Sequence, residues 1–226
     1  MVHKKLRTPF FEIGAKNFMY GNKLLEVAKA ADACAIDNNI DVIFIAPYTD
    51  IRMIARSTKR LLVFAPYMDT LRPGRGLADV LPEAIKDAGA SGVMLNHSER
   101  QISLPVLQQT IERAKELDLI TLVCAGSIAE ARAVACLSPD IINPEETNLI
   151  GSGIVSDSDF VSKSTKAIKE INSNILVEHA AGITKSSQVR KLILAGADGV
   201  GSASGIFLAD DPIKNVKAFI SACKGG

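Results

Sequence analysis

Short apolar runs alternate with longer amphipathic segments along almost the whole chain. Eight of the runs are short and rich in strand-forming residues, and each predicts a strand: residues 9–13, 42–46, 61–65, 92–95, 120–124, 140–142, 174–177 and 199–200. Most of them are nearly continuous in apolar residues rather than alternating. Since parallel strands covered on both faces show this pattern, the runs predict a parallel sheet with helices on both sides or all around it.

The segments between the runs have apolar residues at intervals of three and four, which is typical of helices packed against a sheet. They cover residues 23–38, 81–88, 104–117, 128–137, 160–171, 186–195 and 212–223, with a shorter piece at 50–55. Pro105 and Pro212 fall near predicted helix starts, and Gly89 and Gly196 mark predicted helix ends.

Eight strand-then-helix units with right-handed crossovers close most simply into a (β/α)8 barrel, so we expect one α/β domain covering residues 1–226. An open doubly wound sheet is the alternative. Its usual dinucleotide fingerprint has one candidate here, residues 199–205, but no βαβ unit follows that segment. The position of the glycines therefore favours the barrel.

Composition narrows the functional classes. The chain has 226 residues, of which 47% are hydrophobic, and its net charge is +1 with the basic residues spread along it, so nucleic acid is not expected as a partner. No apolar run reaches the roughly 18 residues of a membrane span, and the basic start leads into an apolar patch that Glu12 interrupts. We expect a cytoplasmic protein without a membrane association. The cysteines form no CxxC pair, which indicates structural thiols.

Polar residues follow several of the predicted strands, where a barrel places its active site. Lys16 follows the first strand, Asn96 and His97 follow the fourth, Glu145 follows the sixth and His179 follows the seventh. All of them are expected at one mouth of the barrel. A carboxylate, an imidazole and an ammonium group together can remove a proton next to a carbonyl and stabilise the resulting enediolate.

Two glycine-rich segments, residues 151–153 and 201–205, precede helical or turn segments, where backbone N–H groups can hold a phosphate. No cluster of metal ligands accompanies them. The sequence therefore predicts aldose–ketose isomerisation of a phosphorylated sugar, without a metal or another cofactor.

The motif Asn96-His97-Ser98-Glu99 resembles the histidine motif of the triosephosphate isomerase family, and Glu145 precedes Gly151 by six residues, as the catalytic glutamate does in that family. The resemblance covers nearly the whole chain and is strongest toward the compact archaeal-type branch. It implies the TIM barrel fold and a role in glycolysis and gluconeogenesis. The implied reaction interconverts dihydroxyacetone phosphate and glyceraldehyde 3-phosphate.

The resemblance also implies roles for particular residues. Lys16 is the substrate-site lysine, His97 the electrophile, Glu145 the base and Glu99 a supporting carboxylate. Backbone at four positions is expected to hold substrate or its phosphate: Gly151, Gly182, Ala203 and Ser204. Residues 145–151 are expected to form a lid. A homo-oligomer, either a dimer or a tetramer, is implied through the loop at residues 67–79, whose arginines fit an interface better than a phosphate clamp.

The chain departs from the family pattern at several positions. Gly14 stands where the family has an asparagine, Glu146 where it has a proline, and Ala180 in a turn that is otherwise glycine-rich; Pro66 and Tyr67 replace polar residues. Two alternatives therefore stay open. One is an isomerase of a related ketose phosphate such as a tetrulose phosphate, and the other is a non-catalytic barrel that binds a phosphorylated metabolite.

Overall fold

Eight parallel strands close into a barrel in which each strand pairs with its neighbours along the chain and the last pairs with the first. The computed structural model describes residues 6–224. The strands are β1 (Phe10–Gly14), β2 (Asp41–Ile45), β3 (Leu62–Ala65), β4 (Gly92–Leu95), β5 (Ile120–Ala125), β6 (Ile141–Pro144), β7 (Leu176–His179) and β8 (Gly199–Ser202). This ring confirms the (β/α)8 barrel and excludes the open sheet.

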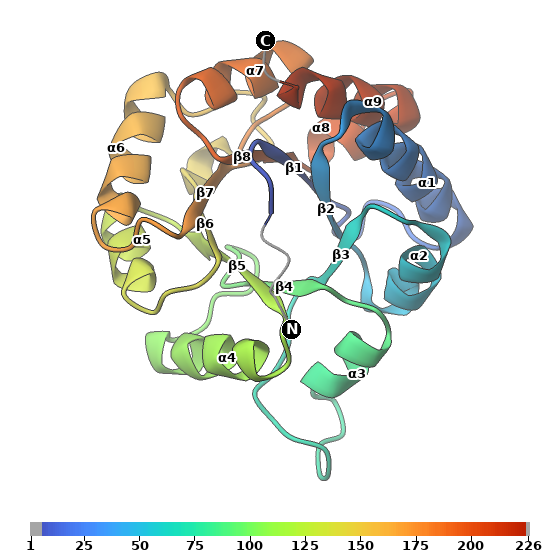
Figure 1. Cartoon of the computed structure of the whole chain (residues 1–226), viewed down its shortest axis with the longest axis vertical. Coiled ribbons are helices and arrows are strands. Elements are labelled where there is room, and N and C mark those ends of the chain that lie inside the picture. Colours follow the sequence, from blue (N-terminus) through green and yellow to red (C-terminus); the bar gives the residue numbers. More distant parts are fainter. Residues whose placement is uncertain (1–5, 225–226) are drawn as a thin grey trace.

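Helices surround the ring of strands, as Figure 1 shows in a view along the barrel. They are α1 (Gly21–Asn38), α2 (Ile51–Ser57), α3 (Pro82–Asp87), α4 (Leu104–Glu116), α5 (Ile128–Ala135), α6 (Ser158–Lys169), α7 (Ser186–Leu194), α8 (Ser204–Phe207) and α9 (Pro212–Cys223), with 3-10 turns η1 (Tyr48–Asp50) and η2 (Thr147–Leu149). The short α8 and both 3-10 turns were not expected from the sequence. In residues 6–224, no helix is both long and apolar enough to cross a membrane.

Alternate residues of each strand belong to two separate cores. The larger core lies between the strands and the helices, and the smaller one fills the inside of the barrel. Phe10 and Phe64 are fully buried in the inner core, and they fit because Gly199 and Gly92 face them: a Cβ on either glycine would collide with the facing ring. The inside of the barrel is therefore packed at this level, not open as a pore.

Several strands end later than the apolar runs predicted. The first strand covers 10–14 instead of 9–13, and β6, β7 and β8 continue to Pro144, His179 and Ser202. The second strand instead lies one residue earlier than predicted, at 41–45, and the third starts one residue later, at 62. In β6 and β7 the added residues include Asn143 and Glu178, which are buried polar side chains. The strands continue past the end of the apolar sequence because backbone pairing does not depend on apolar side chains.

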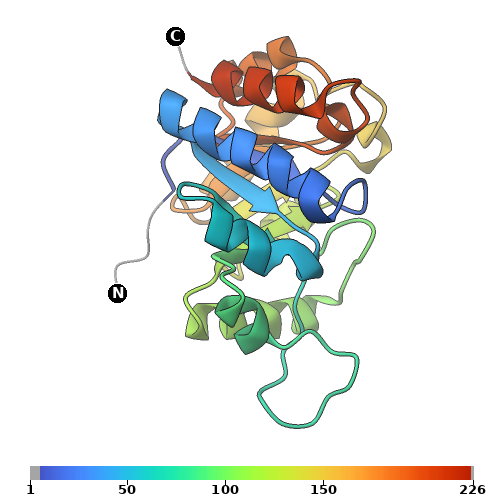
Figure 2. The same ribbon diagram turned by 90° about the vertical axis from the view of Figure 1, so that its right-hand side faces the viewer.

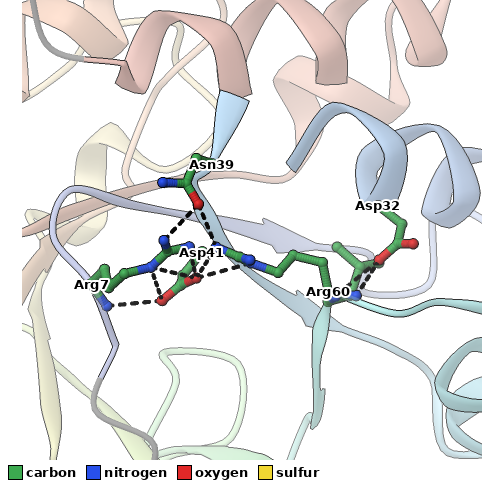
Figure 3. A network of polar contacts seen from close by, with 6 residues as sticks. Arg7, Asp32, Asn39, Asp41 and Arg60 are labelled. Atoms are coloured by element: carbon green, nitrogen blue, oxygen red, sulfur yellow. Dashed lines mark hydrogen bonds and ion pairs between the residues drawn. The ribbon is translucent and has the colours of Figure 1, made fainter. Parts of the chain in front are cut away.

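A polar network links the chain segments at the starts of β1, β2 and β3, at the N-terminal end of the barrel (Figure 3). Asp41, at the start of β2, accepts hydrogen bonds from the guanidinium groups of Arg7 and Arg60. Asp32 of α1 accepts backbone N–H bonds from Arg60 and Leu61, just before β3. Since this end of a barrel lies opposite the usual active-site mouth, these charged groups serve stability.

The segment between β3 and α3 projects from the body of the barrel, as Figure 2 shows from the side. Its base is fixed, because Asp69 accepts hydrogen bonds from the Tyr67 hydroxyl and from the backbone N–H of Val80. Arg72 forms an ion pair with Glu116 of α4. Residues 72–79 are exposed to solvent.

Candidate active site

The C-terminal ends of the strands surround a cavity of about 620 Å³. Lys16, His97, Glu99 and Glu145 line it, although they come from the ends of three different strands. The four phosphate-binding candidates also line it: Gly151, Gly182, Ala203 and Ser204. The fold therefore brings the candidate residues into one cavity at the end of the barrel where such enzymes carry out their chemistry.

His97 follows β4 and has a defined tautomer in its neutral form. The backbone N–H of Glu99 donates a hydrogen bond to His97 Nδ1, with 3.1 Å between the nitrogens. Since Nδ1 is the acceptor, the ring proton of the neutral imidazole lies on Nε2. Burial lowers the pKa of His97, and the nearby Lys16 charge lowers it further. The ring is therefore kept neutral and presents an N–H donor to a ligand.

The preceding residue anchors this turn. Asn96 has a φ of 56°, in the left-handed region that asparagine adopts more readily than most residues. Its side-chain amide donates to the carbonyl of Cys124 and to Glu130, and its oxygen accepts the backbone N–H of Ile102. These bonds connect the end of β4 with β5 and α5, so the position of His97 is set by buried contacts.

Lys16 is half-buried directly after β1 and has a φ of 44°. Its Nζ lies 2.7 Å from Glu99 Oε1, which joins the ends of β1 and β4 across the mouth. The hydrogen bond from Lys16 lowers the pKa of Glu99 despite partial burial. A lysine in a rarely populated backbone conformation is a feature often found at functional sites.

Glu145 begins the loop after β6 and is 6% exposed. Its backbone N–H donates to the carbonyl of Ala125 at 2.8 Å, which holds the start of the loop against β5. Burial raises the pKa of its carboxyl group, while Lys16 and the side chain of Asn143 oppose that rise. A carboxylate with a raised pKa is a stronger base, which suits it to take a proton from carbon.

The loop after Glu145 lines the cavity with Ile150 and Gly151 and contacts the loop after β7. Gly182 has a φ of 75°, and a Cβ there would collide with the carbonyl of Ile154. Gln188 of α7 donates from Nε2 to the carbonyl of Gly153 at 3.0 Å. The same side chain accepts the backbone N–H groups of Thr184 and Lys185 through its Oε1. The expected lid is thus connected to the expected phosphate loops.

One sequence expectation about an individual side chain was wrong. His179 was expected at the mouth, but it is the last residue of β7 and packs edge-on against Phe160 of α6, outside the barrel. Burial lowers its pKa to about 4. Arg72 and Arg75 do not line the cavity, in agreement with the sequence interpretation that disfavoured a phosphate clamp for them.

Three buried polar side chains inside the strands were not among the sequence candidates: Glu12, Asn143 and Glu178. Glu12 and Asn143 line the cavity one step deeper than Gly14 and Glu145. Burial raises the pKa of Glu12 to about 8, with the Glu145 charge adding to the rise. Glu12 could have been recognised in the sequence because it is a carboxylate within an otherwise apolar strand. It also precedes Gly14 by two residues, so both positions lie on the inner face of that strand.

Among the residues that the structure describes, no group of three or more histidine, cysteine or carboxylate side chains could hold a metal ion. Cys34, Cys124 and Cys223 are buried free thiols, and Cys136 is an exposed one. The charged and polar groups that line the cavity include carboxyl, imidazole and ammonium groups.

Comparisons with known proteins agree with this geometry. A family model described as triosephosphate isomerase matches residues 13–222. The chain is 37% identical to a triosephosphate isomerase of Methanocaldococcus jannaschii over 90% of its own length and 92% of that protein. It is 36% identical to the enzyme of Methanobacterium bryantii, covering 95% and 96% of the two chains, and 35% identical to that of Sulfurisphaera tokodaii, covering 95% of each.

Proposed function

Because the chain belongs to the triosephosphate isomerase family, we propose that it interconverts dihydroxyacetone phosphate and glyceraldehyde 3-phosphate, with Glu145 as the base and His97 as the electrophile. The observation that carries this proposal is the arrangement of the cavity. A buried carboxylate, an imidazole with its proton on Nε2 and an ammonium group all line it.

The first step is removal of a proton from carbon. In dihydroxyacetone phosphate, Glu145 takes a proton from the hydroxymethyl carbon next to the carbonyl, and the electron pair of that C–H bond forms the enediolate. His97 hydrogen-bonds from Nε2 to the oxygens, where negative charge develops, and it moves the second proton of the reaction: it gives its Nε2 proton to the former carbonyl oxygen and takes the hydroxyl proton from the neighbouring oxygen. The positive charge of Lys16 stabilises the same charge. Protonated Glu145 then returns the proton to the neighbouring carbon, which gives the aldehyde.

The phosphate group would be held by backbone N–H groups of the loops after β6, β7 and β8. Ala203 and Ser204 stand at the start of α8, and the first N–H groups of a helix have no partner within it. Gly151 and Gly182 contribute close backbone approach from the other side. Closure of the segment 145–151 over this group would exclude water from the enediolate. That exclusion protects the intermediate from side reactions.

Two further expectations belong to this proposal. We infer a homo-oligomer, a dimer or tetramer, in which the projecting segment at residues 67–79 contacts a second copy. It is supported by the fixed base of that segment and its exposed tip. We also place the enzyme in the cytoplasm, where the phosphorylated sugars of glycolysis are found.

A coupled assay of triose phosphate interconversion tests the proposed activity, and two adjacent glutamates provide a matched pair of variants. Glu145→Gln should lower kcat by roughly 10²- to 10⁴-fold with little change in KM, because a general base acts in the transition state. Glu146→Gln removes the same charge from a side chain that does not line the cavity, so its activity should stay within about threefold of wild type.

Turnover should persist in excess EDTA. Absence of triose phosphate turnover in the folded wild-type protein would contradict the proposed reaction. Equal losses in the two variants would instead show that Glu145 is not the base.

A further inference from the structure

One carboxylate of α5 contacts the loops that follow two neighbouring strands. Glu130 stands in the first turn of α5 and is half-buried. Its Oε1 accepts a hydrogen bond from the side-chain amide of Asn96 at 2.9 Å, and its Oε2 accepts one from the backbone N–H of Gly126 at 2.7 Å. Asn96 directly precedes His97, and Gly126 directly follows β5. A single side chain therefore joins the loop of the proposed electrophile to the loop after β5.

The bond to Gly126 leads on to the proposed base. The N–H of Gly126 and the C=O of Ala125 belong to the same peptide unit, and that C=O accepts the backbone N–H of Glu145 at 2.8 Å. Since consecutive hydrogen bonds polarise one another, the carboxylate on the N–H strengthens the bond that the C=O makes to Glu145. The same peptide unit lies next to the lid, because a Cβ on Gly126 would stand 3.6 Å from Cγ2 of Thr147.

These contacts form a continuous path between the two reacting groups. The path runs from the residue before His97, through Glu130, to the peptide unit 125–126 and ends at the backbone of Glu145. Its two ends are buried, since Asn96 and Glu145 are each 6% exposed. Water therefore competes little for the bonds at these ends, and the path links the electrophile loop to the base loop.

Helix capping accounts for only one of the two bonds that Glu130 accepts. Ser127 is the N-cap of α5 and accepts the backbone N–H of Glu130. A glutamate at this position commonly reaches back to a free backbone N–H near the helix start, which the bond to Gly126 achieves. The bond to Asn96 crosses to a residue 34 positions earlier and is not part of a cap. It requires a second function of the same carboxylate.

We propose that Glu130 is a positioning residue, which holds the electrophile His97 and the base Glu145 at the mutual distance that proton transfer requires. This inference rests on the proposed function, since it uses the same base and electrophile. Glu130 does not line the cavity, so it acts through the two loops and not on the substrate. Placement has a large effect on rate, because a displacement of about 1 Å can cost about 100-fold.

The first test replaces the carboxylate with an amide. Both partners of Glu130 are donors, and a glutamine has one acceptor oxygen and one donor NH2 group, so Glu130→Gln loses one of the two bonds in either orientation. In a coupled assay with triose phosphate, kcat should fall by about 10- to 100-fold. KM should stay within about threefold of wild type, because the phosphate loops after β7 and β8 lie outside the path.

Two inhibitors separate misplacement of the reacting groups from a general loosening of the site. 2-Phosphoglycolate has a planar carboxylate that resembles the enediolate, whereas inorganic phosphate occupies the phosphate site alone. In Glu130→Gln, the inhibition constant of 2-phosphoglycolate should rise by about tenfold, and that of inorganic phosphate should stay within about threefold of wild type. Equal rises for both inhibitors would overturn the positioning role.

Glu112→Gln is the matched control. It makes the same chemical change on α4, where Glu112 accepts a hydrogen bond from Gln108 of its own helix at an exposed position. The values of kcat and of both inhibition constants should stay within about threefold of wild type. A loss of kcat as large as that of Glu130→Gln would show that the path to the two loops is not the cause.

Amide hydrogen exchange tests the path independently of activity. The amide protons of Gly126 and Glu145 should exchange at least about tenfold faster in Glu130→Gln than in the wild type, and at the wild-type rate in Glu112→Gln. Unchanged exchange at Glu145 would overturn the path. If the folded wild type does not convert triose phosphate, the proposed function fails, and these exchange rates still decide whether Glu130 holds the two loops.

Glu130→Asp keeps the test decisive if the glutamine variant does not fold. It retains the negative charge and both acceptor oxygens, but its shorter side chain does not reach both donors. The same faster exchange at Glu145 and a similar fall in kcat are expected. Wild-type exchange and wild-type kcat in Glu130→Asp would assign the role to charge alone and overturn the positioning path.

Discussion

The buried carboxyl groups at the floor of the cavity have a consequence for stability. Glu12 faces the carboxyl groups of Glu145 and Glu178 and the ammonium group of Lys16, and burial together with Glu145 raises its pKa from 4.5 to about 8. A group with a raised carboxyl pKa binds its proton more tightly in the folded state. Its contribution to stability is therefore present below the unfolded pKa and is lost as the pH rises toward 8.

We predict that Glu12→Gln makes the free energy of unfolding less dependent on pH between about 5 and 8. Glutamine keeps the shape of a protonated glutamic acid but has no proton to lose. At pH 8.5 the variant should exceed the wild type in stability by about 1 kcal/mol or more, since one pKa unit corresponds to about 1.4 kcal/mol. Urea unfolding at pH 5.5 and 8.5 measures the difference.

A matched control is Glu146→Gln, which removes a carboxylate from the neighbouring loop. It should leave the pH dependence of the wild type in place. Parallel stability curves for the wild type and Glu12→Gln over this range would show that Glu12 is ionised in the folded protein.

Sequence alone identifies the residues that follow strands but not those inside them. Lys16, His97 and Glu145 could be predicted because each comes directly after an apolar run, where a barrel has its mouth. Glu12 and Asn143 lie within β1 and β6, so strand ends did not reveal them. Alternate residues of a strand face the same side, so Glu12 and Asn143 can be assigned to the inner face only once Gly14 and Glu145 are known to face inward.

The same period explains the error at His179. Neighbouring residues of a strand point to opposite faces, and Glu178 lies inside the barrel with Glu12. His179 must then face the helices, where it meets Phe160. The sequence alone does not show which of Glu178 and His179 faces the inside of the barrel.

At the scale of elements, one side chain of α7 contacts the loop that contains the proposed lid. Gln188 accepts two backbone N–H groups at the start of its own helix and donates to the carbonyl of Gly153, two residues after the proposed lid segment 145–151. Gln188→Glu keeps the acceptor oxygens and removes the donor. Gln188→Ala removes both, so the two variants separate the lid contact from the helix start.

We predict that both variants lower kcat/KM for triose phosphate by about threefold to tenfold, since one intramolecular hydrogen bond contributes about 0.5–1.5 kcal/mol. Amide hydrogen exchange of residues 147–153 should become faster in both, and only Gln188→Ala should also lose thermal stability. Unchanged exchange in the lid of Gln188→Glu would show that Gly153 is held by other contacts.

Most elements were predictable because their signals are local. Strand and helix order follows from the apolar runs and the three-to-four spacing, and the closed ring follows from eight repeated units. The ends were less predictable. Helix α6 begins at Ser158, earlier than the expected residue 160, because Asp157 accepts the backbone N–H of Phe160 and caps the helix. The η2 turn depends on loop contacts that leave no periodic pattern in the sequence.

At the scale of the whole molecule, stability and chemistry occupy opposite ends of the barrel. The network of Arg7, Asp41 and Arg60 fastens the N-terminal end, and the cavity with its acid and base groups lies at the other. Substitutions in the network should therefore act on folding, while loop substitutions around the cavity act on turnover. The segment at residues 67–79 starts at the cavity, which Tyr67 lines, and then extends away from the barrel (Figure 2).

This segment provides the last prediction, which concerns assembly. Asp69 holds its base, Arg72 forms an ion pair with Glu116 of α4, and Leu77 is fully exposed to solvent. We expect the wild type to sediment as a dimer or tetramer at micromolar concentration. Leu77→Asp should shift it toward a monomer, because a charge replaces apolar surface that a second copy would bury.

Leu194→Asp is the matched control, since Leu194 is a similarly exposed leucine on α7, far along the chain from the projecting segment. It should leave the sedimentation coefficient unchanged. If only Leu194→Asp dissociates the oligomer, the interface lies at α7 and not at the projecting segment. A wild-type monomer at these concentrations would contradict the oligomer, and the projection would then be a surface loop whose rigidity serves the neighbouring Tyr67 wall of the cavity.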